Sequence, residues 1–288
     1  WGKGFAVFST FFGIIGSLLA FIILGGNFLH IILGEIVLFS SDVFALLFWA
    51  LLSFFIVRGI QLIAKAEFIM NIVLFAGIFA IFLFAAPHVK LGNFALINTS
   101  NLFLPYGVIL FALVGWHAIP EIADFFKGRR EKRNLDNLIV AAGVITTLLF
   151  LLFTLFVVGV SGEATSPDAL QGLIPFLGKG VIILGAVFGL VAIAASFLVL
   201  GNYLKNSLRY DFHLPYAASV SIAIFSPLLL FLLGIREFVL VLGLVGIVLG
   251  VVEGTLIVAL FLKAKKKGTR QPEYALRIPR FVPYLVVF

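Results

Sequence analysis

One stretch of the chain places several polar residues inside an otherwise apolar segment. Residues 110–126, LFALVGWHAIPEIADFF, hold Gly, Trp, His, Pro and Glu within seven positions. A histidine ring titrates near neutrality, so His117 could donate to a ligand, relay a proton or stay neutral beside a backbone partner. Glu121 lies one turn later on the same helical face. It could handle an ion or a proton, or it could cap a new helix whose first turn favours a carboxylate.

The same stretch predicts a break in a helix. Gly115 lowers the cost of irregular backbone, and Pro120 lacks an amide hydrogen and suits the first turn of a helix. We expect half-helices over 106–114 and 118–128, with a break over 114–117. In lipid, irregular backbone is tolerated only where it is buried in protein or lines a water-filled cavity. The break therefore indicates either a site for an ion or substrate, or a proline kink packed against neighbouring helices.

The composition predicts an all-α integral membrane protein. Of 288 residues, 62% are apolar and only 11% are charged, which is far outside the range of soluble domains. The apolar residues form long runs separated by short polar stretches, and the alternating strands of a membrane barrel are not seen. The absence of cysteine excludes disulfides and thiolate metal sites.

Eight membrane spans are expected along the chain. A helix needs about 20 apolar residues to cross the hydrocarbon, so the first span must tilt or protrude and the second is short. In the outer loop over residues 162–173, Ser166-Pro167-Asp168 indicates a helix start. The spans cover residues 4–33, 42–57, 60–86, 104–126, 135–161, 180–203, 214–234 and 238–262.

The basic residues predict the orientation of these spans. If the first span starts in the cytoplasm, all but three of the twenty Lys and Arg residues lie inside, the exceptions being Lys90, Lys179 and Arg236. The positive-inside rule favours this arrangement. We therefore expect a multi-pass plasma-membrane protein. Its formal charge is +7, and we expect its basic side chains to contact lipid rather than nucleic acid.

Polar residues also interrupt three other spans. Asn27 could contact a substrate or form a hydrogen bond between helices. Ser196 ends a face of small residues that allows helices to approach closely. Glu253 sits inside the last span, where a charge costs about 2.5–3.5 kcal/mol, so it should have a polar partner or a protonation role.

Small residues form stripes on the first and last spans, which predicts close helix crossings there. The stripes are Gly13, Gly16 and Ala20, and Gly246, Gly250 and Gly254.

Enzymatic chemistry finds little support in the sequence. His117 and Glu121 have the spacing of metal ligands, but no second His-rich span complements them. A phosphate-binding loop of the GxxxxGK type is also absent. We expect no metal, no catalytic residue and no enzyme activity.

Three segments resemble helices of the amino acid/auxin permease family, within the amino acid, polyamine and organocation superfamily. Residues 107–153, with FALVG followed by AIPE and a basic loop, are similar to its sixth and seventh helices. Residues 188–211 resemble its eighth helix and residues 243–267 its tenth. The resemblance implies a LeuT-like fold of inverted repeats, in which the chain supplies helices three to ten and the start of an eleventh.

The resemblance also implies a function and site residues. It implies secondary active transport of neutral amino acids, aromatic or branched ones favoured, with no cofactor beyond a coupling Na⁺ or H⁺. Ala112, Gly115, Trp116 and His117 fall where the sixth helix contacts substrate, although Trp116 could instead pack at an interface. Ser196 matches a position whose hydroxyl helps to hold a coupling sodium.

Glu121 and Glu253 are the candidates for handling the coupling ion or proton. The family's first two helices are not represented, so we expect that these residues alone cannot transport. A membrane receptor or scaffold that uses the same fold without transport is the alternative function.

Overall fold

The computed structural model describes residues 2–59, 64–95, 104–115, 119 and 129–267. Within these ranges every regular element is helical and no strand is present. The longer elements are α1 (Gly2–Leu33), α2 (Ser41–Val57), α3 (Ala64–Ala85), α4 (Leu104–Leu113), α6 (Arg129–Ser161), α8 (Lys179–Tyr210), α9 (Tyr216–Leu232), α10 (Phe238–Ile247) and α11 (Gly254–Lys267). The shorter ones are α7 (Ile174–Leu177), the π-helical η7 (Val248–Glu253), and the 3₁₀ turns η1 (Ala86–His88), η2 (Leu91–Ala95), η5 (Gly162–Ala164) and η6 (Gln171–Leu173).

Five helical segments of the described chain are long and apolar enough to cross a membrane, which is the pattern of a multi-pass membrane protein. They are Gly4–Leu33, Ile69–His88, Leu135–Ala164, Lys179–Tyr210 and Phe238–Lys263. The expected spans at 42–57 and 214–234 correspond to α2 and α9, apolar helices of 17 residues each. The expected span at 104–126 is described as a helix only over α4.

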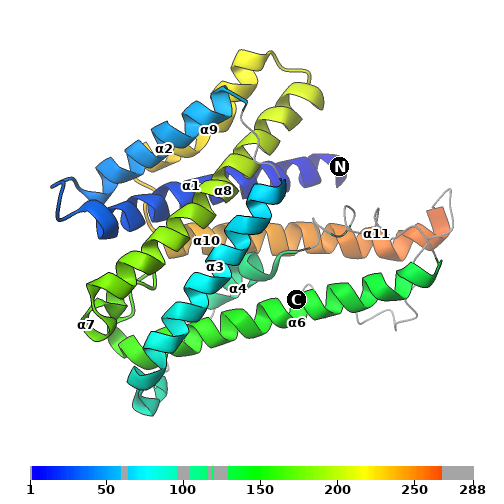
Figure 1. Ribbon diagram of the computed structural model, residues 1–288. Helices are drawn as coiled ribbons and strands as arrows, with labels where there is room; N and C mark the ends of the chain where they lie inside the picture. Colours follow the sequence, from blue (N-terminus) through cyan, green and yellow to red (C-terminus); the bar gives the residue numbers. More distant parts are fainter. Residues whose placement is uncertain (1, 60–63, 96–103, 116–118, 120–128, 268–288) are drawn as a thin grey trace.

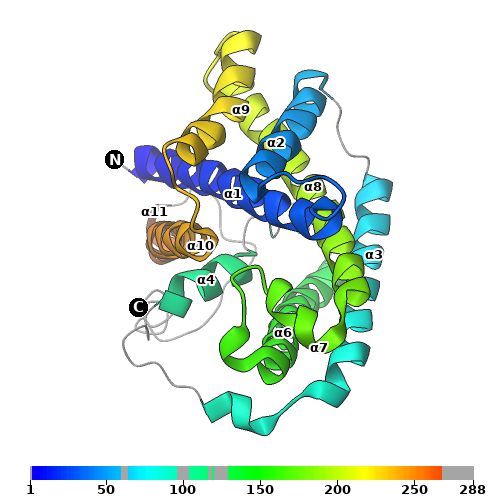
Figure 2. The same cartoon turned by 90° about the vertical axis from the view of Figure 1, so that its left-hand side faces the viewer.

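Helix α1 lies at the centre of the molecule. It packs against α2, α8 and α9 on one side and against α10 and η7 on the other (Figures 1 and 2). Leu18, Leu19 and Ile22 are at most 1% exposed, as expected for a helix surrounded by other helices. One hydrophobic core joins these residues to Ile56 of α2 and Phe197 of α8.

A second core lies where α1, α3, α6 and α8 meet the short elements of residues 162–177. It contains Phe28, Ile81, Val157 and Ile182. Asp168, 8% exposed, accepts hydrogen bonds from the backbone nitrogens of Leu170 (3.1 Å) and Gln171 (3.0 Å). The helix start predicted at Ser166-Pro167-Asp168 is wrong in position, because Pro167 and Asp168 lie in a turn and the next helical element, η6, begins only at Gln171.

Helix α10 and η7 form close crossings on two sides. Toward α1, a Cβ atom on Gly13 would meet Leu249 at 2.6 Å, and one on Gly16 would collide with Val245. Toward α4, a Cβ atom on Gly250 would meet Leu110 at 2.5 Å. Glycines at these positions let the backbones approach closely, which agrees with the stripes seen in the sequence.

Helix α9 contains a proline, and the turn before it is bonded to a neighbouring helix. Pro227 cannot donate to a carbonyl one turn earlier. The indole nitrogen of Trp49 on α2 donates to the carbonyl oxygen of Ile224 in this turn, at 2.8 Å. This turn of α9 is thereby tied to α2.

Candidate functional site

The polar interruption singled out in the sequence coincides with a helix end. Helix α4 ends at Leu113, and the next two residues, Val114 and Gly115, are not helical. The last four carbonyl groups of an α-helix have no partner within the helix, so this end presents hydrogen-bond acceptors. Gly115 is exposed, and a Cβ atom there would meet only the carbonyl oxygen of Leu113, at 3.9 Å.

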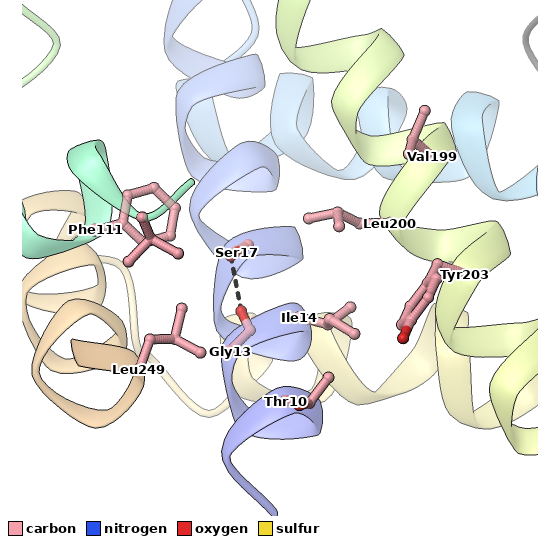
Figure 3. Close-up of a pocket in the computed structure, with 10 residues that line it drawn as sticks. Thr10, Gly13, Ile14, Ser17, Phe111, Val199, Leu200, Tyr203 and Leu249 are labelled. Atoms are coloured by element: carbon pink, nitrogen blue, oxygen red, sulfur yellow. Dashed lines mark hydrogen bonds between the residues drawn. The ribbon is translucent and has the colours of Figure 1, made fainter. Parts of the chain in front are cut away.

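A cavity of about 530 Å³ lies beside this helix end. The volume falls within the usual range for small-molecule sites. Figure 3 shows the side chains of α4 and η7 on one side of α1 and those of α8 on the other. The wall is formed by Thr10, Gly13, Ile14, Ser17, Phe111, Val114, Val199, Leu200, Tyr203 and Leu249.

The wall is mostly apolar, with a few polar groups at fixed places. The Ser17 hydroxyl donates to the carbonyl oxygen of Gly13 at 2.7 Å, the bond drawn in Figure 3. The Thr10 hydroxyl donates to Oε1 of Glu253 at 3.4 Å. Val199 and Tyr203 remain exposed, so the cavity is open on the α8 side.

Glu253 is a buried carboxylate at the edge of this cavity. It is 8% exposed and is the last residue of η7, one turn beyond the wall residue Leu249. A π-helical turn is closed by hydrogen bonds between residues five apart, and such turns are frequent at functional sites. The predicted polar partner of Glu253 is present, since Thr10 donates to it.

Comparisons of this chain with protein-family models, with curated proteins and with solved structures find no match.

The residues predicted for the site are only partly gathered around the cavity. Ala112 lies half-buried in the last turn of α4, between the wall residue Phe111 and the helix end. Ser196 is one turn before the wall residue Leu200, and its hydroxyl donates to the carbonyl oxygen of Ala192 at 3.1 Å. Asn27 is not in the wall, because ten residues of helix, roughly 15 Å, separate it from Ser17.

Three of the predicted residues, Trp116, His117 and Glu121, lie outside the described residues. Sequence reasoning missed the two wall hydroxyls that α1 supplies, those of Thr10 and Ser17. Their signal was present, since Thr10, Gly13 and Ser17 are spaced by three and four residues and therefore share one face of α1.

Proposed function

We propose that this protein is a secondary active transporter of neutral amino acids. The observation that supports it most is the cavity beside the interrupted end of α4, in a bundle of helices suited to a membrane. Carriers of this type bind substrate near the midplane, where broken helices offer backbone groups. The resemblance of residues 107–153 to an amino acid permease points to the same function.

The chemistry of the wall favours a zwitterion with an apolar side chain. The C-terminal end of a helix carries partial negative charge, so the end of α4 favours a substrate ammonium group or a cation. Phe111, Ile14 and Leu200 supply apolar surface for the side chain, and burial of each CH₂ contributes about 0.8 kcal/mol. Thr10, Ser17 and Tyr203 supply hydroxyl groups that can fix orientation.

Transport needs parts that move relative to one another. Helices α1, α2, α8 and α9, which we name the four-helix body, share one hydrophobic core that also includes Val241, Val245 and Leu249 of α10 and η7. Helix α4 packs chiefly against α10. In our proposal the α4 side rocks against the four-helix body, which exposes the cavity alternately to the two faces of the membrane.

Coupling to an ion is assigned to the acidic and hydroxyl groups near the cavity. Glu253 is connected to the cavity wall through Thr10, and Ser196 lies one turn from it. A carboxylate with hydroxyl neighbours can bind either a sodium ion or a proton, and the uptake experiment below distinguishes the two.

Uptake by the full-length protein in proteoliposomes tests the proposal. Radiolabelled leucine and phenylalanine are added with external sodium or with external choline. Each is tested at equal pH on the two sides and with the outside more acidic than the inside. We expect saturable uptake driven by one of the two gradients, and Glu253→Gln should remove the gradient dependence. Thr147→Val is the matched control, because that hydroxyl donates only within exposed α6, to Gly143 at 2.8 Å. Amino acid binding without any uptake would instead favour a receptor.

A further inference from the structure

One end of the four-helix body gathers three cationic side chains. Helix α2 ends at Val57 and α8 ends at Tyr210. The two ends are adjacent, because the Lys205 ammonium donates to the carbonyl oxygen of Ile56 at 3.3 Å. The Tyr216 hydroxyl at the start of α9 donates to the carbonyl oxygen of Val57 at 2.6 Å. Arg58, Lys205 and Arg209 therefore belong to one junction of α2, α8 and α9, which we name the basic junction.

The cations of the basic junction lack carboxylate partners within the described chain, in contrast to those at the opposite ends of the same helices. Where α8 begins, Lys179 pairs with Glu35. Where α2 begins, Asp42 pairs with Arg236 at 2.5 Å. No such ion pair involves Arg58, Lys205 or Arg209 in the described residues.

The acidic residue nearest to the basic junction in the chain is Asp211. Its carboxylate accepts a hydrogen bond from the Ser207 hydroxyl at 2.7 Å. The three cations and this one carboxylate leave the junction with a net positive charge. An anion from outside the described chain is the natural complement.

The two arginines present their hydrogen-bond donors in a favourable way. The Arg209 guanidinium stacks over Tyr210 and Tyr216, 5.3 and 5.2 Å from the ring centroids. The Arg58 guanidinium lies 4.9 Å from the ring centroid of Phe54. Stacking uses the face of the guanidinium group and leaves its in-plane N–H groups free, and this fork matches the oxygens of a phosphate.

We propose that Arg58 and Arg209 bind the phosphate of an anionic lipid headgroup at the junction of α2, α8 and α9. Lys205, only 4% exposed, lies behind them and donates to the end of α2. The apolar surroundings favour a lipid over a soluble anion: Phe54 is 50% exposed and Phe212 45% exposed, so acyl chains can cover them. Basic pockets between membrane helices are known to receive such headgroups.

Lipid retention by the purified full-length protein tests this site. The protein is exchanged into vesicles of equimolar phosphatidylglycerol and phosphatidylcholine, re-extracted in mild detergent, and its co-purifying lipid is quantified. We expect enrichment of phosphatidylglycerol in the wild type and about fivefold weaker retention for each arginine removed in Arg58→Gln and Arg209→Gln. Arg236→Gln removes an equal charge at the opposite end and should leave lipid retention unchanged.

Two further arms keep the test decisive. Arg58→Lys with Arg209→Lys retains charge but loses the planar fork, so it should show intermediate retention and a normal elution profile even if the glutamine variants fold poorly. Inorganic phosphate alone should not raise the melting temperature in detergent, whereas phosphatidylglycerol should. Equal retention by the wild type and the double variant Arg58→Gln/Arg209→Gln would overturn the site. Equal stabilisation by inorganic phosphate would overturn its assignment to lipid.

Discussion

The carbonyl oxygen of Gly107 on α4 occupies the space that a Cβ atom on Gly246 of α10 would need. The backbones of the two helices are therefore in direct contact. The contact continues at Gly250, where a Cβ atom would press on Leu110 at 2.5 Å. This crossing holds α4, and with it the end of α4 at the cavity, in place.

The substitution Gly246→Ala should push these two backbones apart. The added methyl group meets a carbonyl group rather than a flexible side chain, so we expect a loss of about 1–3 kcal/mol. Thermal melting of the detergent-solubilised protein measures it. Gly243→Ala is the control on the same helix, because its Cβ atom would have nothing within 4 Å. Similar melting temperatures for the two variants would contradict the close crossing.

Filling the cavity should block uptake without unfolding the protein. Leu200 lines the cavity from α8, so Leu200→Trp should clash with a bound substrate and lower uptake by about tenfold or more. Leu184→Trp adds the same ring to α8 at a site that is 44% exposed and should keep uptake near the wild-type level. If both variants melt like the wild type and transport equally, the substrate does not occupy this cavity.

The substitution Lys205→Met should destabilise the protein although it adds apolar surface. The Lys205 ammonium donates to the amide oxygen of Asn202 at 2.6 Å as well as to Ile56. Removing it leaves buried acceptors with fewer partners, which costs about 1–3 kcal/mol. Lys263→Met, at an exposed position of α11, should change the melting temperature little. An equal response of the two variants would mean that Lys205 does not stabilise the end of α2.

The ion pair between Arg236 and Asp42 should contribute little to stability. Its side chains are 46% and 48% exposed, and exposed pairs contribute about 0.2–1 kcal/mol. A double-mutant cycle with Arg236→Gln and Asp42→Asn should give a coupling energy in that range, measured by chemical denaturation. Raising the salt to about 1 M should shrink it, because the screening length falls to about 3 Å. A coupling energy that does not respond to salt would argue for a buried pair.

The sequence predicted the elements well because their signals are local. Apolar runs located α2 and α9 closely, and the polar stretch that begins at Gly115 marked the region where α4 ends. The glycine stripes predicted the close crossings, since small residues on one face of a membrane helix let the backbone of a neighbouring helix approach closely.

Other features depend on contacts between distant residues and could not be predicted. Lys205 was counted as a flanking charge after a span ending at 203, whereas α8 continues to Tyr210. Asn202 and the end of α2 give the Lys205 ammonium group hydrogen-bond partners inside the bundle. The cavity wall combines residues from four elements, and only the tertiary packing brings Thr10 to Glu253. The widened turn of η7 has no compositional signal, because any apolar residues can adopt it.

That widened turn sets the direction in which the Glu253 side chain points from the last membrane helix. A π turn contains one residue more than an α turn. If the extra residue shifts along the helix by one position, the side chain at that position turns by about 100° around the helix axis. Displacement of the extra residue toward Lys267 would swing the Glu253 carboxylate away from Thr10 while Gly246 stayed against Gly107. The position of the π turn along this helix therefore decides whether the Glu253 carboxylate faces Thr10.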